Sequence, residues 1–184
     1  MGLAGAGGIM RPDTVEGSKK KVLVITNDST VFLSDGYVSA YEMYGGRLTE
    51  VRNLYDRLAE ITTTNFGIIT GKFGFIPSNH VVMKYDFVPS CKEDYVKLQE
   101  EKDFVGMTGF LVKPFDKVVI CVPKDMFEML IPVLPDNKVI AVTNRKFKKH
   151  CKEHGWSFYL RKGARVGNAN ADAIVKEIQE FIDS

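Results

Sequence analysis

Five short apolar runs, rich in β-branched residues, recur along the chain and are separated by segments of helical periodicity. They are Lys20–Thr26, Asn65–Thr70, Asp116–Pro123, Lys138–Thr143 and Trp156–Arg161. Strands of a parallel sheet are buried on both faces, so they read as continuous apolar runs rather than as alternating patterns. The sequence therefore predicts an α/β fold, a three-layer sandwich with a mostly parallel five-stranded sheet.

The intervening segments predict helices on both faces of that sheet. A short helix is expected over 37–44, and Leu48, Val51, Leu54, Tyr55, Leu58 and Ile61 recur at the spacing of a second helix. Further helices are expected over 90–104, 124–131 and 145–155. The last helix presents an apolar face made by Ala173, Ile174, Ile178, Phe181 and Ile182.

Composition limits the class of protein. A chain of 184 residues with 45% hydrophobic residues can bury one substantial core, so 19–184 is expected to form a single domain. The glycine-rich segment 1–18 lacks the apolar core of a secretory signal and is expected to be a flexible tail. No apolar run is long enough to span a membrane. Cys91, Cys121 and Cys151 show no CxxC spacing, which favours a reducing cytoplasm over a disulfide framework.

Charge is unevenly distributed although the net charge is only +2. The segment 138–165 contains nine Lys and Arg residues and one acid, Glu153, a local charge of +8. Such a region can attract phosphates. The alternative is a solvated helix face.

In a parallel sheet, ligands bind outside the carboxyl ends of the strands. The loops expected there are TNDST, TGKFGF, PKD, TNR and RKGARVGNAN, which offer hydroxyls, amides and cations with few acids. This composition suits a nucleotide, base or phosphate. Asn27, Asn144, Arg145 and Arg165 are the candidate ligand-binding residues contributed by these loops.

The loop after the second predicted strand places Lys72 between two glycines. Gly71 and Gly74 permit close approaches that a side chain would block, and Lys72 could then reach an anion beside Thr70. We expect Lys72 to point into the main cleft. The loop lacks the Walker pattern, and a tight turn with a solvated lysine is the alternative.

Two further positions are candidates. Asp86, next to Tyr85, could orient a water molecule or bind a base edge near Lys72, and a turn or capping aspartate is the alternative. Asn168 lies at the start of the last predicted helix, where exposed amides can bind an anion. The alternative is that Asn168 or Asn170 caps this helix.

Other chemistries find little support. His150 and His154 have the i, i+4 spacing of a zinc pair, but no further ligand cluster accompanies them, so no metal and no cofactor is predicted. The sequence has no G-x-S-x-G elbow and no CxxC motif, which argues against a serine hydrolase and a thiol redox enzyme.

The segment 41–87, AYEMYGG followed by ITGKFGFIPSNHVVMKYDF, resembles the shared core of the YaaA-like peroxide-stress superfamily and its smaller uncharacterised relatives. ITGKFGFI is similar to the turn of that family, with Thr70-Gly71 in place of Ser-Ala, and MKYDF to its P-Y-D element. The resemblance implies roles for Lys72, Gly74, Tyr85 and Asp86. It also implies similarity to DNA-binding proteins that limit oxidative damage and to glycosylase-type three-layer sandwiches.

Three functional hypotheses follow. The first is a protein that binds DNA, RNA or a nucleotide through its basic region and its Gly-Lys loop. The second is an enzyme acting on a nucleoside or nucleobase, with Asp86 as the catalytic carboxylate. The third is a non-catalytic interaction domain in which the acidic helix 90–104 and the basic helix 145–155 are complementary surfaces.

Overall fold

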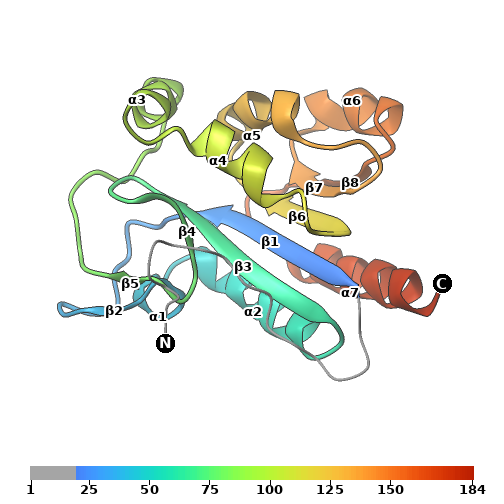
Figure 1. Ribbon diagram of the computed structural model, residues 1–184, viewed down its shortest axis with the longest axis horizontal. Helices are drawn as coiled ribbons and strands as arrows, with labels where there is room; N and C mark the ends of the chain where they lie inside the picture. Colours follow the sequence, from blue (N-terminus) through green and yellow to red (C-terminus); the bar gives the residue numbers. More distant parts are fainter. Residues whose placement is uncertain (1–19) are drawn as a thin grey trace.

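A six-stranded sheet forms the centre of the molecule in a computed structural model that describes residues 20–184 (Figure 1). The strand order is β4-β3-β1-β6-β7-β8. All neighbouring pairs are parallel except β3 and β4. The predicted three-layer α/β class is therefore correct. The predicted tail, 1–18, lies outside the described residues.

Five of the strands coincide with the predicted apolar runs. They are β1 (Lys21–Asn27), β3 (Thr63–Thr70), β6 (Lys117–Cys121), β7 (Val139–Thr143) and β8 (Ser157–Leu160). Alternate side chains of β1 enter different layers. Val22 and Val24 pack with one apolar cluster, whereas Leu23 and Ile25 pack with the other. Burial on both faces explains why these runs are continuously apolar.

The sixth strand, β4 (Gly74–Pro77), corrects the predicted count of five. It pairs antiparallel with β3 through a tight turn, and Thr70 lies opposite Gly74. The hydroxyl of Thr70 fixes this turn, accepting from Phe73 N–H at 2.9 Å and donating to the Gly74 carbonyl at 3.0 Å. Four residues bounded by Gly74 and Pro77 carry too weak a pattern to predict a strand.

Helices cover both faces of the sheet. One layer contains α1 (Ala40–Met43), α2 (Leu48–Ala59) and α7 (Asn168–Asp183). The opposite layer contains α3 (Lys92–Lys102), α4 (Phe104–Leu111), α5 (Lys124–Leu130) and α6 (Lys148–Glu153) (Figure 1). Short 3₁₀ turns, η2 (Ile131–Val133) and η3 (Arg145–Phe147), follow α5 and precede α6. None of the helices within 20–184 has the length and apolar character needed to cross a membrane.

Two predicted helices differ from the structure for local reasons. The predicted 37–44 helix shrinks to α1, because β2 (Val38–Ser39) pairs with β5 (Val81–Val82) in a small separate sheet. The predicted 90–104 helix ends at Asp103, whose φ of 46° is left-handed. The carboxylate of Asp103 then accepts from Gly106 N–H at 3.0 Å and starts α4.

The chain changes direction across the sheet between β1 and β6. From β1 it passes through α2 to β3 on one side, and β6, β7 and β8 then follow on the other side of β1. At such a switch point the loops leaving the two central strands diverge, so a crevice opens at their carboxyl ends. This geometry locates the candidate site.

Candidate functional site

A cleft of about 430 Å³ lies at the carboxyl ends of β1 and β6. Its lining comes from distant parts of the chain: the loop Asn27–Val31, Gly46 and Arg47, the segment Val88–Ser90, Tyr95, Pro123, Arg161 and Arg165. The volume lies within the range of about 300–1,000 Å³ typical of small-ligand pockets. The cleft therefore coincides with the switch point of the sheet.

Asp28 is the buried carboxylate of this cleft, with 2% of its surface exposed. Its Oδ2 accepts from the Tyr85 hydroxyl at 2.6 Å and from Gly71 N–H at 2.8 Å. Burial raises the pKa of Asp28 from 3.8 to about 6, although Tyr85, Gly71 and the charge of Arg165 each oppose the rise. Asp28 can therefore gain or lose a proton near neutral pH.

Two tyrosines form a hydrogen-bonded chain that ends on Asp28. The hydroxyls of Tyr44 and Tyr85 are 2.6 Å apart, and because Tyr85 donates to Asp28, Tyr44 is the donor to Tyr85. Phe32 and Phe73 pack edge-on against the Tyr85 ring at 5.1 and 5.8 Å. Burial raises the pKa of both tyrosines, so both remain protonated donors. The chain holds Oδ2 in one position and leaves Oδ1 outside these contacts.

Arg165 fixes a positive charge at the end of β1. Its guanidinium donates to Thr26 Oγ1 at 3.0 Å, to the Asn27 carbonyl, and to the Asp28 carbonyl at 2.6 Å. Burial lowers the pKa of Arg165 to about 10, which still leaves it cationic at neutral pH. These bonds go to one hydroxyl and two backbone carbonyls rather than to the Asp28 carboxylate, so Arg165 is not in an ion pair.

Three polar groups near the strand ends are buried without a hydrogen-bond partner among residues 20–184. They are Nη1 of Arg161, Oδ1 of Asn27 and Oγ1 of Thr143. Arg161 and Asn27 line the cleft, whereas Thr143 ends β7. Burying an unpaired polar group costs about 1–3 kcal/mol, and such groups are uncommon in folded proteins. Arg161 and Asn27 therefore each bring a polar atom without a partner to the lining of the cleft.

Gly71 is required by a close approach of two backbone segments. A Cβ at this position would lie 1.8 Å from the Phe87 carbonyl oxygen and 2.7 Å from Pro89 Cδ. The same packing brings the Gly71 N–H to Asp28. Gly74 has a φ of +69°, and a Cβ there would lie 2.9 Å from Lys102 Cβ. Backbone packing and conformation thus explain why glycine is needed at both positions. Gly71 also contributes a hydrogen bond to Asp28 in the site.

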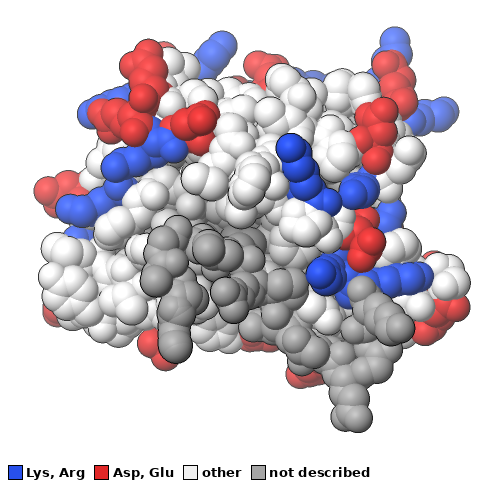
Figure 2. All heavy atoms as spheres, in the orientation of Figure 1, with Lys and Arg blue, Asp and Glu red and all other residues white. Residues whose placement is uncertain are grey.

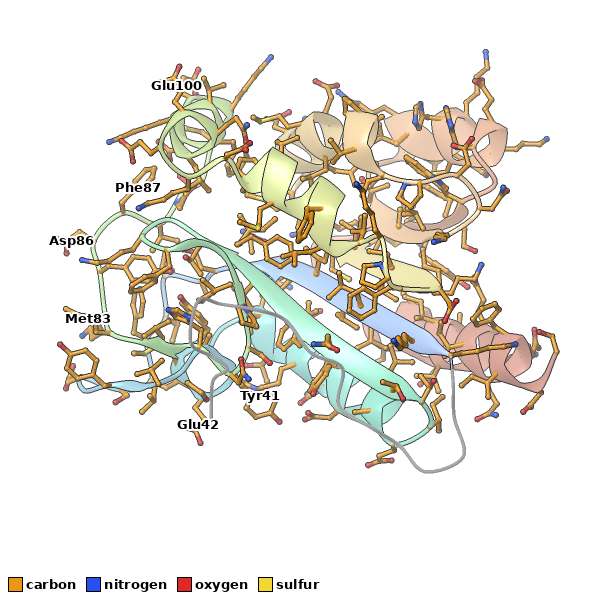
Figure 3. The ribbon with its side chains drawn as sticks, viewed as in Figure 1. Tyr41, Glu42, Met83, Asp86, Phe87 and Glu100 are labelled. Atoms are coloured by element: carbon orange, nitrogen blue, oxygen red, sulfur yellow. The ribbon has the colours of Figure 1, made fainter. Side chains whose placement is uncertain are left out.

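The expectation that Lys72 points into the main cleft is wrong. Lys72 is exposed and lies with Asp86 at a separate, smaller hollow of about 350 Å³ beside α3. Asp86 is also exposed, and Figure 3 places it on the outer edge of the loop between β5 and α3. The expected proximity of Asp86 to Lys72 is present. Among the ion pairs within residues 20–184, none involves Lys72 or Asp86.

The other predicted site residues are dispersed. Asn27 and Arg165 lie in the cleft, whereas Tyr85 lines the hollow that holds Lys72 and Asp86 and touches the cleft only through its bond to Asp28. Asn144 caps η3, because its Oδ1 accepts from Lys146 N–H at 2.9 Å. Arg145 is exposed. Thr70 and Gly74 belong to the β3–β4 turn described above.

Asn168 lies at the start of α7 and lines a different pocket of about 470 Å³. Neither Asn168 nor Asn170 caps the helix, because the N-cap is Gly167. The Nδ2 of Asn170 donates to the Leu160 and Val166 carbonyls at 2.9 and 2.8 Å. The carboxylate of Glu50 accepts from the N–H groups of Val166 and Gly167 at 3.1 and 3.2 Å. A side-chain anion therefore already occupies this end of α7.

The two histidines of α6 form part of a packed aromatic group. The rings of His150 and His154 stack with centroids 4.2 Å apart, and Trp156 lies beside both. His154 Nδ1 bonds Asp136 at 2.8 Å. Within residues 20–184 no group of three or more His, Cys, Asp or Glu side chains could hold a metal ion.

The predicted basic region is divided by the fold. Lys138 precedes β7, at the amino ends of the parallel strands. Helix α6 carries Lys148, Lys149 and Lys152, whereas Arg161 and Arg165 line the cleft at the carboxyl ends. Exposed acids accompany several of these cations: Lys146 pairs with Glu128 at 3.1 Å, and Lys149 with Glu153 at 3.9 Å. In Figure 2, residues of both signs alternate around the visible face.

Asp28, Arg161 and Tyr44 were not among the predicted site residues. Asp28 lies two residues after the predicted strand 20–26, and Arg161 is the last residue of the predicted strand 156–161. Both therefore lie in the loops expected at the strand ends, where functional side chains concentrate. Tyr44 carried no signal, since its partner Tyr85 lies 41 residues away in the chain.

Comparisons of this chain with protein-family models, with characterised proteins and with solved structures return no match.

Proposed function

We propose that the cleft binds a nucleotide, with its phosphate on Arg161 and its sugar or base against the loop Asn27–Val31. The observation that carries this proposal is the buried, unpaired Nη1 of the half-buried Arg161 in a cleft that the buried guanidinium of Arg165 also lines. Arginine presents planar donors that match phosphate oxygens, and a ligand phosphate would give Nη1 the acceptor that it lacks.

The cleft favours a mononucleotide over a nucleic-acid polymer. Its volume of about 430 Å³ suits one small ligand, and its cations are concentrated at one point rather than along a track. The unpaired acceptor of Asn27 and the hydroxyls of Ser29 and Thr30 can meet the polar groups of a sugar or base. Tyr85, from the segment that resembles the YaaA-like core, supports Asp28 at this place.

Isothermal titration calorimetry with 5′-AMP, adenosine and inorganic phosphate tests the proposal. Arg161→Ala should weaken AMP binding by about 10–100-fold, because one charged hydrogen bond is worth about 1.5–3 kcal/mol. The matched control is Arg57→Ala, which removes an exposed arginine paired with Asp172. Adenosine affinity should be unchanged by either substitution. Failure of AMP to bind, or an equal loss in both variants, would refute the proposal.

A labelled single-stranded oligonucleotide provides the comparison with nucleic acid. Fluorescence anisotropy should report only weak binding that disappears as salt rises, because exposed lysines alone would hold the backbone. If the oligonucleotide binds more tightly than AMP, and if Arg161→Ala loses this binding, the ligand of the cleft is a nucleic acid rather than a mononucleotide.

An enzyme acting on the bound nucleotide is a second candidate function, favoured by one observation. Asp28 lines the cleft and titrates near pH 6, within the range that general acid–base catalysis uses. Asp28 thus replaces the exposed Asp86 as the carboxylate of this hypothesis. Chromatography of 5′-nucleotides incubated with the protein would detect product, and the second candidate requires that Asp28→Asn abolish its formation.

A further inference from the structure

The cleft combines one buried and one half-buried guanidinium group, those of Arg165 and Arg161, with the buried carboxylate of Asp28. This combination affects any anionic ligand. Asp28, Arg161 and Arg165 line the same cavity. A phosphate that approaches the arginines also approaches Asp28. Two negative groups in a desolvated site cannot both stay ionised without strong repulsion, and the usual resolution is one shared proton.

The groups around Asp28 leave it as the one that can take this proton. Tyr85 and Gly71 donate to Oδ2, and Tyr44 stands behind Tyr85 as a further donor. Burial raises the pKa of both tyrosines, so neither becomes a base. Arg165 donates to the backbone carbonyl of Asp28 and not to its carboxylate. The bonds from Tyr85 and Gly71 therefore engage Oδ2 and leave Oδ1 outside them.

The remaining charged and titratable lining groups come from three other elements. Arg161 follows β8, Arg47 precedes α2, and Tyr95 belongs to α3. The guanidinium groups attract the phosphate, and burial raises the pKa of Tyr95, which keeps it neutral. None of the three can relieve the repulsion between the phosphate and Asp28 by accepting a proton.

We propose that the cleft takes up a phosphate monoester together with one proton, which is shared between Oδ1 of Asp28 and a phosphate oxygen. This inference rests on the proposed nucleotide function and names its ligand class. The second ionisation of a phosphate monoester has a pKa of about 6. The pKa of Asp28 is also about 6. A phosphodiester has no second ionisation and no oxygen of matching basicity.

The proton gives the binding a definite pH dependence. Below pH 6 the proton is already present on Asp28 or on the free phosphate. At higher pH, binding must take it from solvent, so the dissociation constant rises by as much as about tenfold per pH unit. Asparagine at position 28 keeps an oxygen for Tyr85 and Gly71 but carries no charge. Asp28→Asn should therefore bind the dianion better than the wild type does at high pH.

Calorimetry with 5′-AMP between pH 6.5 and 8.5 tests the inference. We expect a wild-type dissociation constant that rises about tenfold per pH unit, and an uptake of close to one proton at pH 7.5, measured in buffers of different ionisation enthalpy. Asp28→Asn should lose most of the slope and bind AMP about tenfold more tightly at pH 8. The control Asp35→Asn, which removes an exposed carboxylate, should behave as the wild type.

Further ligands separate the possible failures. Inorganic phosphate should take up the same proton if the phosphate alone is recognised, and 3′,5′-cyclic AMP, a diester, should bind at least tenfold more weakly than AMP at pH 6. AMP binding without proton uptake, equal slopes for wild type and Asp28→Asn, or equal affinity for the diester would overturn the inference and leave nucleotide binding intact. Absence of AMP binding by every protein at every pH would overturn the proposed function itself.

Discussion

Replacing Asp28 by asparagine should change how the stability of the fold depends on pH. In the wild type, burial raises the pKa of Asp28 from 3.8 to about 6. Between these values the folded state binds more protons than the unfolded state. The stabilisation is therefore fully present below pH 3.8 and is lost as the pH rises through about 6. The difference between the two pKa values corresponds to about 3 kcal/mol.

The measurable part of this effect lies between pH 7.5 and pH 5. Over that interval Asp28 should add about 1.4 kcal/mol to the wild-type free energy of unfolding, and Asp28→Asn should lack this gain. Urea denaturation at both pH values gives the double difference, in which the other titrating groups cancel. Asp35→Asn serves as the control because Asp35 is almost fully exposed. Parallel pH curves for wild type and Asp28→Asn would show that the buried carboxyl does not titrate as described.

Three further substitutions examine the surroundings of the site. Gly71→Ala should lower the free energy of unfolding by about 3 kcal/mol, since its Cβ would collide with a carbonyl 1.8 Å away, and thermal denaturation would detect this. Tyr85→Phe should cost about 1–3 kcal/mol by leaving the buried Tyr44 hydroxyl unpaired, and should raise the pKa of Asp28 further, which carboxyl NMR titration would measure. Lys72→Ala should change stability by less than about 0.5 kcal/mol and leave AMP affinity unchanged, because Lys72 is exposed at a separate hollow; calorimetric loss of AMP binding would contradict the assignment of the cleft.

The parallel core of the fold was predictable because burial on both faces leaves a strong signal in each strand. Val22–Ile25 illustrates this, since successive residues enter opposite layers and all four are fully buried. The edge strand β4 was not predictable in the same way. It covers only four residues, and its pairing depends on the turn that Thr70 stabilises rather than on an apolar run.

The site was predictable in position but less so in composition. The rule that ligands bind at the carboxyl ends of parallel strands selected the loops that contain Asn27 and Arg165. The rule could not favour Asp28 over Asp86 as the carboxylate of the site. Asp28 is buried and Asp86 is exposed, and this difference depends on the whole fold. Tyr85 and Gly71 reach Asp28 across 57 and 43 residues of chain. Lys72 was favoured by its flanking glycines, which prove to serve backbone packing.

NMR of ¹⁵N-labelled protein titrated with 5′-AMP at pH 6 would locate the ligand most directly. If the switch-point cleft is the binding site, the largest shift changes should occur at the amides of Asn27–Ser29 and at the side-chain Nε–H of Arg161. These signals should move together and saturate with one affinity. Changes confined to the amides around Lys72 and Asp86, or no saturable change anywhere in the spectrum, would contradict the assignment of nucleotide binding to this cleft.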